Sequence, residues 1–176
     1  FICDTRMVLA HLNVDKKTNE IKTIPQLIDM IDIKDATITM DAMGSQRHIA
    51  EVILKKQGHY LMHLKANQKS LRQTILELLP QIMQERDGYF FDQFQQTEPN
   101  AARIETRKIM ISDNIVKTQH LHDWPGLKAI IYIERQRLIK DKVQTQSCIY
   151  LSSQILPAHQ AAHLIRQHWE IENSLH

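Results

Sequence analysis

Two apolar, β-branched runs with a helical segment between them constrain the fold of this chain more than any other feature. The run ATITM, residues 36–40, reads as a buried strand, and YLMHLKA, residues 60–66, reads as the next one. Between them, HIAEVILKK, residues 48–56, carries its apolar residues on one helical stripe, and Gly58 follows as a helix stop. A strand, a helix and a second strand in this order predict a βα unit within an α/β sheet.

The rest of the chain extends this order with further helices and a β-rich stretch. Residues 80–100, rich in glutamine and aromatic side chains, show no clear period. We expect one domain over residues 1–176, with a β-rich insertion over residues 80–156. The other expected elements are a strand over 7–14, a polar loop over 15–23, a helix after Pro25, a helix capped by Asn67 or Ser70, strands that begin near Arg103, Leu127 and Val143, a turn at Trp124-Pro125-Gly126, and a last helix over 157–176.

Composition narrows the class of protein. The 176 residues, 43% of them hydrophobic, suffice for one sizeable core, and a net charge of +2 permits contact with polyanions without requiring it. Cys3 and Cys148 match no disulfide framework and no zinc spacing, which favours a reduced, cytoplasmic setting. No apolar run approaches the roughly 18 residues of a membrane helix, so we expect a soluble protein with no membrane partner.

Asp41 directly follows the first buried strand, in the stretch ATITMDAMGSQ. The carboxyl ends of sheet strands are where α/β folds hold ligands, which favours a functional role for this carboxylate. An aspartate in this place is also a common turn former or helix cap, so the sequence leaves both interpretations open.

Glu172 is the unusual residue of the last helix. At about 100° per residue it falls within the apolar arc, whereas Glu170 faces water. A charged, unpaired carboxylate there would cost several kcal/mol, so it needs a cation or a hydrogen-bonding partner, and His168 or His176 could supply one. A strand-end aspartate and an inward glutamate also fit Mg²⁺, which takes carboxylate oxygens, and two such ions about 4 Å apart support phosphodiester chemistry.

Several blocks, taken in order, resemble the bacterial insertion-sequence transposases of the H-repeat-associated DDE branch. The blocks are TNEIKTIPQLIDMIDI, ITMDAMGSQ, LKANQ, RIETR, WPGLK, YLSS and IRQHWEIENSLH, and together they span nearly the whole chain. The resemblance implies a ribonuclease H-like mixed sheet flanked by helices, with a β-rich insertion before the glutamate helix. It also implies a metal-dependent enzyme that cleaves and transfers insertion-sequence ends, with double-stranded DNA as its partner.

The same resemblance implies two Mg²⁺ ions, a homodimer of the full-length protein, and a place in the bacterial cytoplasm, at the nucleoid when bound to DNA. It assigns Asp41 and Glu172 as the second aspartate and the glutamate of the metal site, so both are expected to be catalytic and metal-binding. The first aspartate of the family ends a strand upstream of Phe1. We therefore expect a domain truncated at its first strand and short of its extreme C-terminus, inactive alone, with an incomplete metal site.

Residues just after the second strand are expected to contact the DNA backbone. Lys65, Asn67 and Lys69 follow that strand on the side of Asp41, and positive charge there would attract phosphates.

Three further residues have two interpretations each. Arg103 and Arg107 share one face of a strand, which is either a phosphate-binding face or a solvated one. In the wider group a tyrosine and an arginine stand seven and four residues before the glutamate, where this chain has Ile165 and His168. His168 is expected either to donate to a DNA phosphate or to lie at the edge of the core.

Three other functions stay open. A nuclease of the same fold would hydrolyse DNA without joining it, whereas a transposase should transfer a 3′-hydroxyl end into target DNA. A catalytically dead DNA-binding remnant would bind DNA in a salt-dependent way with no response to Mg²⁺. A zinc enzyme built on His159 and His163, spaced by four on a helix, would lack the glutamate of an HExxH motif.

Overall fold

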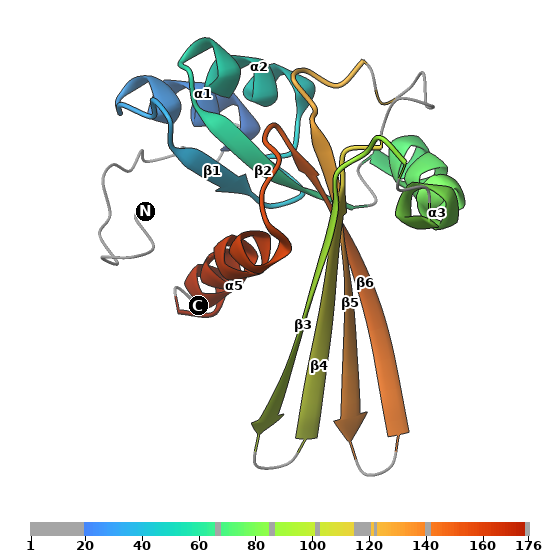
Figure 1. The fold of residues 1–176 in the computed structure, drawn as a ribbon. Helices are drawn as coiled ribbons and strands as arrows, with labels where there is room; N and C mark the ends of the chain where they lie inside the picture. The colour runs from blue at the N-terminus through green and yellow to red at the C-terminus, as the bar shows by residue number, and fades with distance from the viewer. Residues whose placement is uncertain are drawn as a thin grey trace.

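The computed structural model describes residues 20–65, 68–84, 87–100, 103–114, 121, 123–139 and 142–174, which form three layers around one six-stranded sheet (Figure 1). The helices α1, α2 and α3 pack on one face of this sheet, and α5 packs on the other. In chain order the elements are α1 (Glu20–Asp29), β1 (Thr37–Met40), α2 (Arg47–Lys55), β2 (His59–Leu64), α3 (Lys69–Gln84), β3 (Phe91–Asn100), β4 (Arg103–Ser112), β5 (Ala129–Ile139), β6 (Lys142–Ser152) and α5 (Ala158–Ser174).

The sheet is mixed, with the strand order β1-β2-β6-β5-β4-β3. β1 and β2 run parallel, with Thr37 opposite His59 and Met40 opposite Met62, because α2 crosses over between them. β2 then pairs antiparallel with β6, and β6, β5, β4 and β3 follow as an antiparallel meander. The predicted α/β class, a mixed sheet flanked by helices, is confirmed, and the arrangement is compatible with a ribonuclease H-like fold.

Alternation along the strands separates two apolar cores. In β2, Tyr60 and Met62 face α1, α2 and α3, while Leu61 faces α5. On the α5 side, Ala161 and Ile165 of the helix complete the second core. Burial on both faces explains why β2 reads as a nearly continuous apolar run, as strands covered on both sides do.

The strands β3 to β6 are longer than β1 and β2 and project beyond them (Figure 1). In β6, residues 142–146 are exposed and residues 149–152 are buried, so the core lies where the strands meet the helices. We define the outer halves of these strands as the strand arm: residues 95–100, 103–107, 135–139 and 142–146.

The first helix begins earlier than the sequence predicted. α1 starts at Glu20, so the polar loop expected over residues 15–23 is wrong from Glu20 onward. Ile21, Ile24 and Ile28 recur at helical spacing and pack into the core, and this apolar face outweighs the polar residues between them.

The stretch without a clear period also has regular structure. α3 continues through Pro80 to Gln84, and β3 follows from Phe91. The strand expected over residues 7–14 lies outside the described residues. Among the helices that the structure describes, none is both long enough and apolar enough to span a membrane.

Candidate active site and nucleic-acid interface

Asp41 lies at the carboxyl end of β1, in a tight turn that its own oxygens organise. Its Oδ1 atom accepts the backbone N–H of Gly44 at 2.9 Å, and its carbonyl oxygen accepts the Ser45 hydroxyl at 2.6 Å. A Cβ atom added to Gly44 would lie 3.0 Å from the Met40 sulfur, which explains the small residue in this turn. The predicted turn-forming role is therefore observed, and it leaves the second carboxylate oxygen without a hydrogen bond from the described residues.

His63 comes beside Asp41 because β1 and β2 are parallel and in register. Met40 of β1 pairs with Met62 of β2. The next residue in each strand direction, Asp41 and His63, therefore lies at the same edge of the sheet. His63 is 8% exposed, and its ring stacks on Tyr150 with the centroids 4.6 Å apart and the planes 14° apart.

The surroundings of His63 keep its ring uncharged at neutral pH. Burial lowers the pKa of His63 to about 4, and the charges of Lys65 and His168 act in the same direction. Asp41 opposes this shift and Arg72 adds to it. The sequence predictions did not include His63, whose only signal is a polar side chain inside an otherwise apolar run.

The helix α5 is attached to the sheet by polar contacts near its carboxyl end. His168 Nδ1 lies 3.1 Å from the Thr39 hydroxyl oxygen, and Trp169 Nε1 donates to the Tyr150 hydroxyl at 3.1 Å. One ring nitrogen of His168 is thus engaged with β1, and its contact with a DNA phosphate stays a prediction. Ile165, at the position of the family's tyrosine, is buried in the core between α5 and the sheet.

β1 and α5 run in the same direction. The Gln154 side-chain amide donates to the Thr37 hydroxyl at 2.6 Å, and Thr37 lines an open cavity of about 400 Å³ together with His163 of α5. Further along both elements, Thr39 meets His168.

The same cavity contains the histidine pair considered above as a zinc site, because His159 and His163 both line it. The part of the chain that the structure describes holds no group of three or more histidine, cysteine, aspartate or glutamate side chains placed to bind a metal ion. Catalytic zinc sites use three protein ligands, and in this part the pair has no third one.

The other predicted residues lie in separate places. Lys65 is exposed just after β2, and Lys69 is exposed at the start of α3. Arg103 begins β4 and Glu172 lies within α5, and the structure describes the backbone of each but not the side chain. Asn67 lies outside the described residues.

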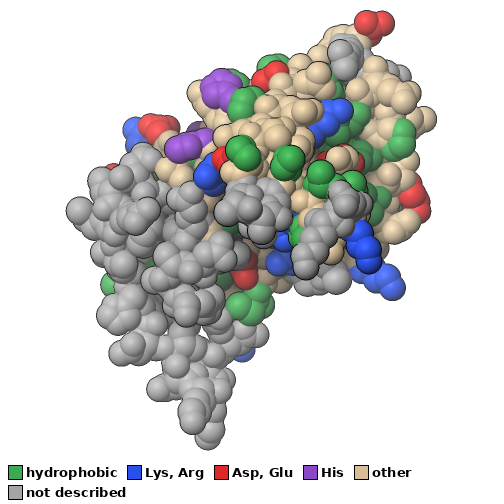
Figure 2. Space-filling view, turned by 90° about the horizontal axis from the view of Figure 1, so that it is seen from below, with side chains coloured by type: hydrophobic (Ala, Val, Ile, Leu, Met, Phe, Trp, Pro, Cys, Tyr) green, Lys and Arg blue, Asp and Glu red, His purple; other side chains and the backbone are tan. Residues whose placement is uncertain are grey.

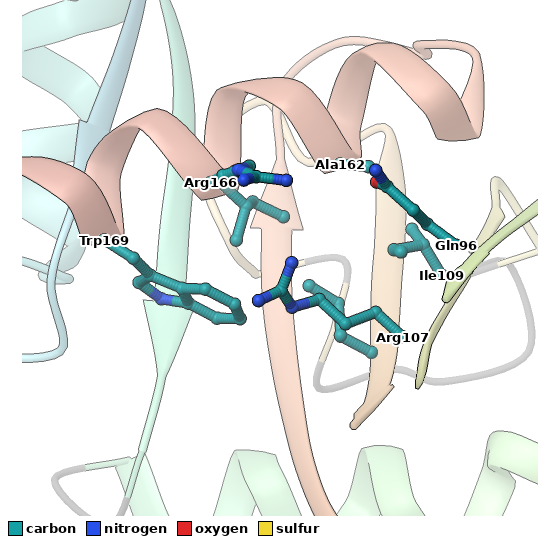
Figure 3. A pocket seen from close by; sticks show the side chains of 8 residues that line it. Gln96, Arg107, Ile109, Ala162, Arg166 and Trp169 are labelled. Atoms are coloured by element: carbon teal, nitrogen blue, oxygen red, sulfur yellow. The ribbon is translucent and has the colours of Figure 1, made fainter. Parts of the chain in front are cut away.

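Arg107 is half-buried in a network of ion pairs on the α5 face of β4. Its side chain is 22% exposed and pairs with Glu98 at 3.3 Å and with Glu105. Figure 3 shows Arg107 beside Trp169 under α5, at a cavity of about 20 Å³ that Arg166 also lines. A cavity of this size holds about one water, so the interface between α5 and the sheet is closely packed here.

The two glutamates of this network stay ionised at neutral pH. Hydrogen bonding to Arg166 lowers the pKa of Glu98 below its ordinary value. Burial raises the pKa of Glu105, but hydrogen bonds and charge from Arg137 and Arg107 outweigh it, so this pKa is also lowered. Neither glutamate was among the sequence predictions, because their partners stand up to 32 and 68 residues away.

Comparisons with known proteins agree with one another. Residues 1–176 match the model of a protein family that is described as "Transposase DDE domain". YhhI of Escherichia coli K12, provisionally named an H repeat-associated transposase, is 35% identical over 97% of this chain and 46% of its own length. YncI of Escherichia coli O157:H7, provisionally named a transposase, is 34% identical over 100% of this chain and 46% of its own length.

A third relative has no assigned activity. It is an uncharacterised protein from the region 3′ of dhlA in Xanthobacter autotrophicus, 32% identical over 86% of this chain and 50% of its own length. The chain spans about half the length of the curated relatives it matches.

Proposed function

The chain belongs to the transposase DDE domain family, in its H-repeat-associated branch, and from this premise we propose that it forms part of a transposase catalytic domain. In the longer protein this domain would cleave DNA at the ends of an insertion sequence and join those ends to target DNA. Because joining requires two DNA ends in one complex, the proposal includes a homodimer of the longer protein.

The observation that carries the proposal is the register between β1 and α5. The two elements run in the same direction, and Thr39 contacts His168. Two residues along a strand advance about 6.7 Å, and four residues along a helix advance about 6 Å. Since α5 remains helical to Ser174, extending this register by one step would bring the backbone of Glu172 level with Asp41.

Asp41 and Glu172 have the chemistry of Mg²⁺ ligands. Hard divalent cations take carboxylate oxygens, and Asp41 has one oxygen without a hydrogen bond from the described residues. These two residues would hold the ions together with the first aspartate of the family's metal site. When bound there, Mg²⁺ would supply Lewis-acid chemistry, by activating a water or a 3′-hydroxyl and stabilising the leaving oxygen.

The surrounding residues would position these ligands. The Gly44 N–H orients the Asp41 carboxylate, and the contact between His168 and Thr39 holds the glutamate helix against β1. Both contacts would reduce the rearrangement that the Asp41 carboxylate and the backbone of α5 need when a substrate binds, which is the usual condition for efficient catalysis.

Duplex DNA, as insertion-sequence ends and as target, is the proposed partner. Lys65 and Lys69 are exposed beside the carboxyl end of β2, the edge at which Asp41 also lies. Positive side chains at this edge would hold the DNA backbone near the proposed metal site. The proposed contacts further include Asn67, Arg103, Arg107 and His168.

The test is a strand-transfer assay on the protein that is expressed from the complete genomic reading frame containing residues 1–176. With duplex insertion-sequence ends, target DNA and Mg²⁺, we expect cleaved and joined products. Asp41→Asn and Glu172→Gln should each reduce both products to background, because each removes a charged ligand. Asp32→Asn is the matched control, because Asp32 is exposed and its side chain accepts only the nearby Lys34 N–H in the described residues.

Each alternative function has its own outcome in this assay. Cleavage without joined products would favour a nuclease of the same fold. Salt-dependent DNA binding with neither product would favour the inactive remnant. Full activity in Glu172→Gln would contradict the assigned site.

A further inference from the structure

Two arginines directly oppose each other on the α5 face of the strand arm. Arg107 of β4 and Arg135 of β5 are partners in the strand register. Like charges in directly opposed positions destabilise a sheet, so this pair requires compensation from its surroundings.

Among the side chains that the structure describes, nearby carboxylates compensate only part of this charge. Glu105 pairs with Arg107 and also accepts a hydrogen bond from Arg137 Nε at 2.7 Å. Glu98 pairs with Arg107 at 3.3 Å and also with Arg166. The two glutamates are therefore shared among three arginines before Arg135 is considered.

Arg135 has no ion pair with any residue that the structure describes. Its guanidinium donates to the Gln146 side-chain oxygen and lies 5.6 Å from the centroid of the Trp169 ring. The Arg107 guanidinium lies 6.0 Å from the same centroid, and Trp169 is itself held by its hydrogen bond to Tyr150. Both cations are thus pre-positioned on one aromatic ring, where cation–π attraction supports them.

The environment of Arg135 is electropositive as well as half-buried. Burial lowers the pKa of Arg135, and the charges of Arg137 and Arg107 add to this lowering, while Glu105 opposes it. Figure 2 views the molecule from the end of the strand arm and shows lysine and arginine side chains interspersed with hydrophobic and acidic ones on the described part of this face. An added anion would lower the electrostatic energy of this cluster.

We propose that Arg107 and Arg135, held against Trp169, bind a backbone phosphate of duplex DNA. Arginine donors match phosphate oxygens in bidentate geometry, and a bound phosphate would relieve the repulsion between the two guanidiniums. Trp169 precedes Glu172 by less than one helical turn, so the phosphate would lie next to the proposed metal site. This inference rests on the proposed function, which supplies DNA as the partner. A phosphate contact would position the DNA without recognising its base sequence.

The test measures duplex DNA binding as a function of salt concentration, with the same protein as in the strand-transfer assay and with Mg²⁺ removed. One lost phosphate contact lowers the slope of log K against log salt by about 0.9. We expect Arg135→Gln to lower the slope by about one unit and to weaken binding roughly three- to tenfold at low salt. Arg135→Lys keeps the charge and should keep most of the slope.

Arg47→Gln is the matched control. Arg47 also lies 6.0 Å from a tryptophan ring, that of Trp124, but on the side of the sheet covered by α1, α2 and α3. This variant should bind DNA with the wild-type slope. Arg135→Gln should in addition unfold at an equal or higher urea concentration than the wild type, because it removes a pair of like charges.

The outcomes separate this inference from the proposed function. A wild-type slope in Arg135→Gln, or no salt-dependent DNA binding by the wild type, would overturn the phosphate site. Reduced stability of Arg135→Gln with an unchanged slope would assign Arg135 a purely structural role. Failure of the wild type to join DNA ends, with the slope of Arg135→Gln still reduced, would contradict the transposase activity and leave the phosphate site standing.

Discussion

At the scale of single residues, burial makes His63 a source of acid sensitivity. Its pKa is lowered to about 4 by burial and by Lys65 and His168, against about 6.5 for histidine in an unfolded chain, with Arg72 adding to the shift and Asp41 opposing it. Because the folded pKa is the lower one, the neutral ring stabilises the fold fully above pH 6.5, and this stability is lost as the pH falls toward 4. Its contribution to the free energy of unfolding should drop by about 2 kcal/mol between pH 7 and pH 5.

Urea unfolding at both pH values measures this contribution. The wild type should lose more stability over the interval than His63→Gln, which has no imidazole to protonate. The control is His48→Gln, a change at an exposed histidine of α2, and it should behave as the wild type does. Equal losses in the wild type and in His63→Gln would show that the fold does not hold a neutral imidazole at this position.

Residue chemistry within one strand was predictable, whereas pairing between strands was not. Asp41 stands out in the sequence because an apolar run ends with it, and the structure places it at the end of β1. Glu105, within RIETR, reads as an ordinary surface charge, yet it is 5% exposed and bound by Arg107 and Arg137. Its burial follows from the register of β4 against β5, which no local pattern encodes.

At the scale of elements, the end of α2 has two neighbouring residues that differ in what they require. Gln57 has a backbone conformation that suits glycine, whereas Gly58 has no room for a Cβ atom. The helix ends at Lys55, and Gln57 has a φ of +59°, a backbone conformation that L side chains rarely adopt. At Gly58 a Cβ atom would lie 2.9 Å from Ile33 Cδ1 and 3.0 Å from the Ile33 carbonyl oxygen. The predicted stop before Gly58 is confirmed, but glycine is needed there for the close approach to Ile33, while the left-handed backbone falls on Gln57.

Substitutions at Gln57 and at Gly58 should therefore change the free energy of unfolding in opposite directions. Gln57→Gly should raise the free energy of unfolding by about 1 kcal/mol, because glycine adopts positive φ without strain. Gly58→Ala should lower it by roughly 1–3 kcal/mol, because the backbone near Ile33 has to move. Urea unfolding of both variants, with Glu51→Ala on the exposed side of α2 as a control, measures the two changes. A destabilised Gln57→Gly would show that the Gln57 side chain matters more than its backbone.

Helical and strand periods predicted the elements that carry the site more closely than the rest. β1, α2, β2 and α5 lie within a few residues of their expected positions. β3 has no such period, because FDQFQQTEPN is mostly polar, and it is a strand because it pairs with β4 from Phe91 to Asn100. As an edge strand it can present polar side chains to water, so tertiary pairing decides its structure.

At the scale of the whole molecule, the order of elements predicted the α/β class but not the way in which the β-rich stretch joins the sheet. β6 pairs with β2, with Leu61 opposite Ser152 and Leu64 opposite Ile149. This pairing places β4 and β5 under α5, and therefore brings Arg107 and Arg135 close to this helix. A connection between residues so far apart leaves no signature in a single sequence, which explains why the arginine pair was not foreseen.

The same architecture predicts that the strand arm opens without the core. In β5, Ile131 is fully buried and Leu138 is 40% exposed, and in β6 Leu151 is fully buried and Val143 is 64% exposed. Segments with few buried apolar contacts open locally at a lower free energy than the core does. Native-state hydrogen exchange should therefore show amides near Leu138 exchanging at least about tenfold faster than amides near Ile131.

Duplex DNA should change this exchange pattern at a defined place, because the proposed phosphate site lies within the strand arm and against α5. Binding at Arg107 and Arg135 should slow exchange in the neighbouring residues of β4 and β5, and Arg135→Gln should abolish most of that protection. Uniform exchange along β5 without DNA would instead mean that arm and core unfold as one unit. The strand arm that carries Arg107 and Arg135 would then be as rigid as the core. DNA binding to the arm would then cost no free energy for ordering it.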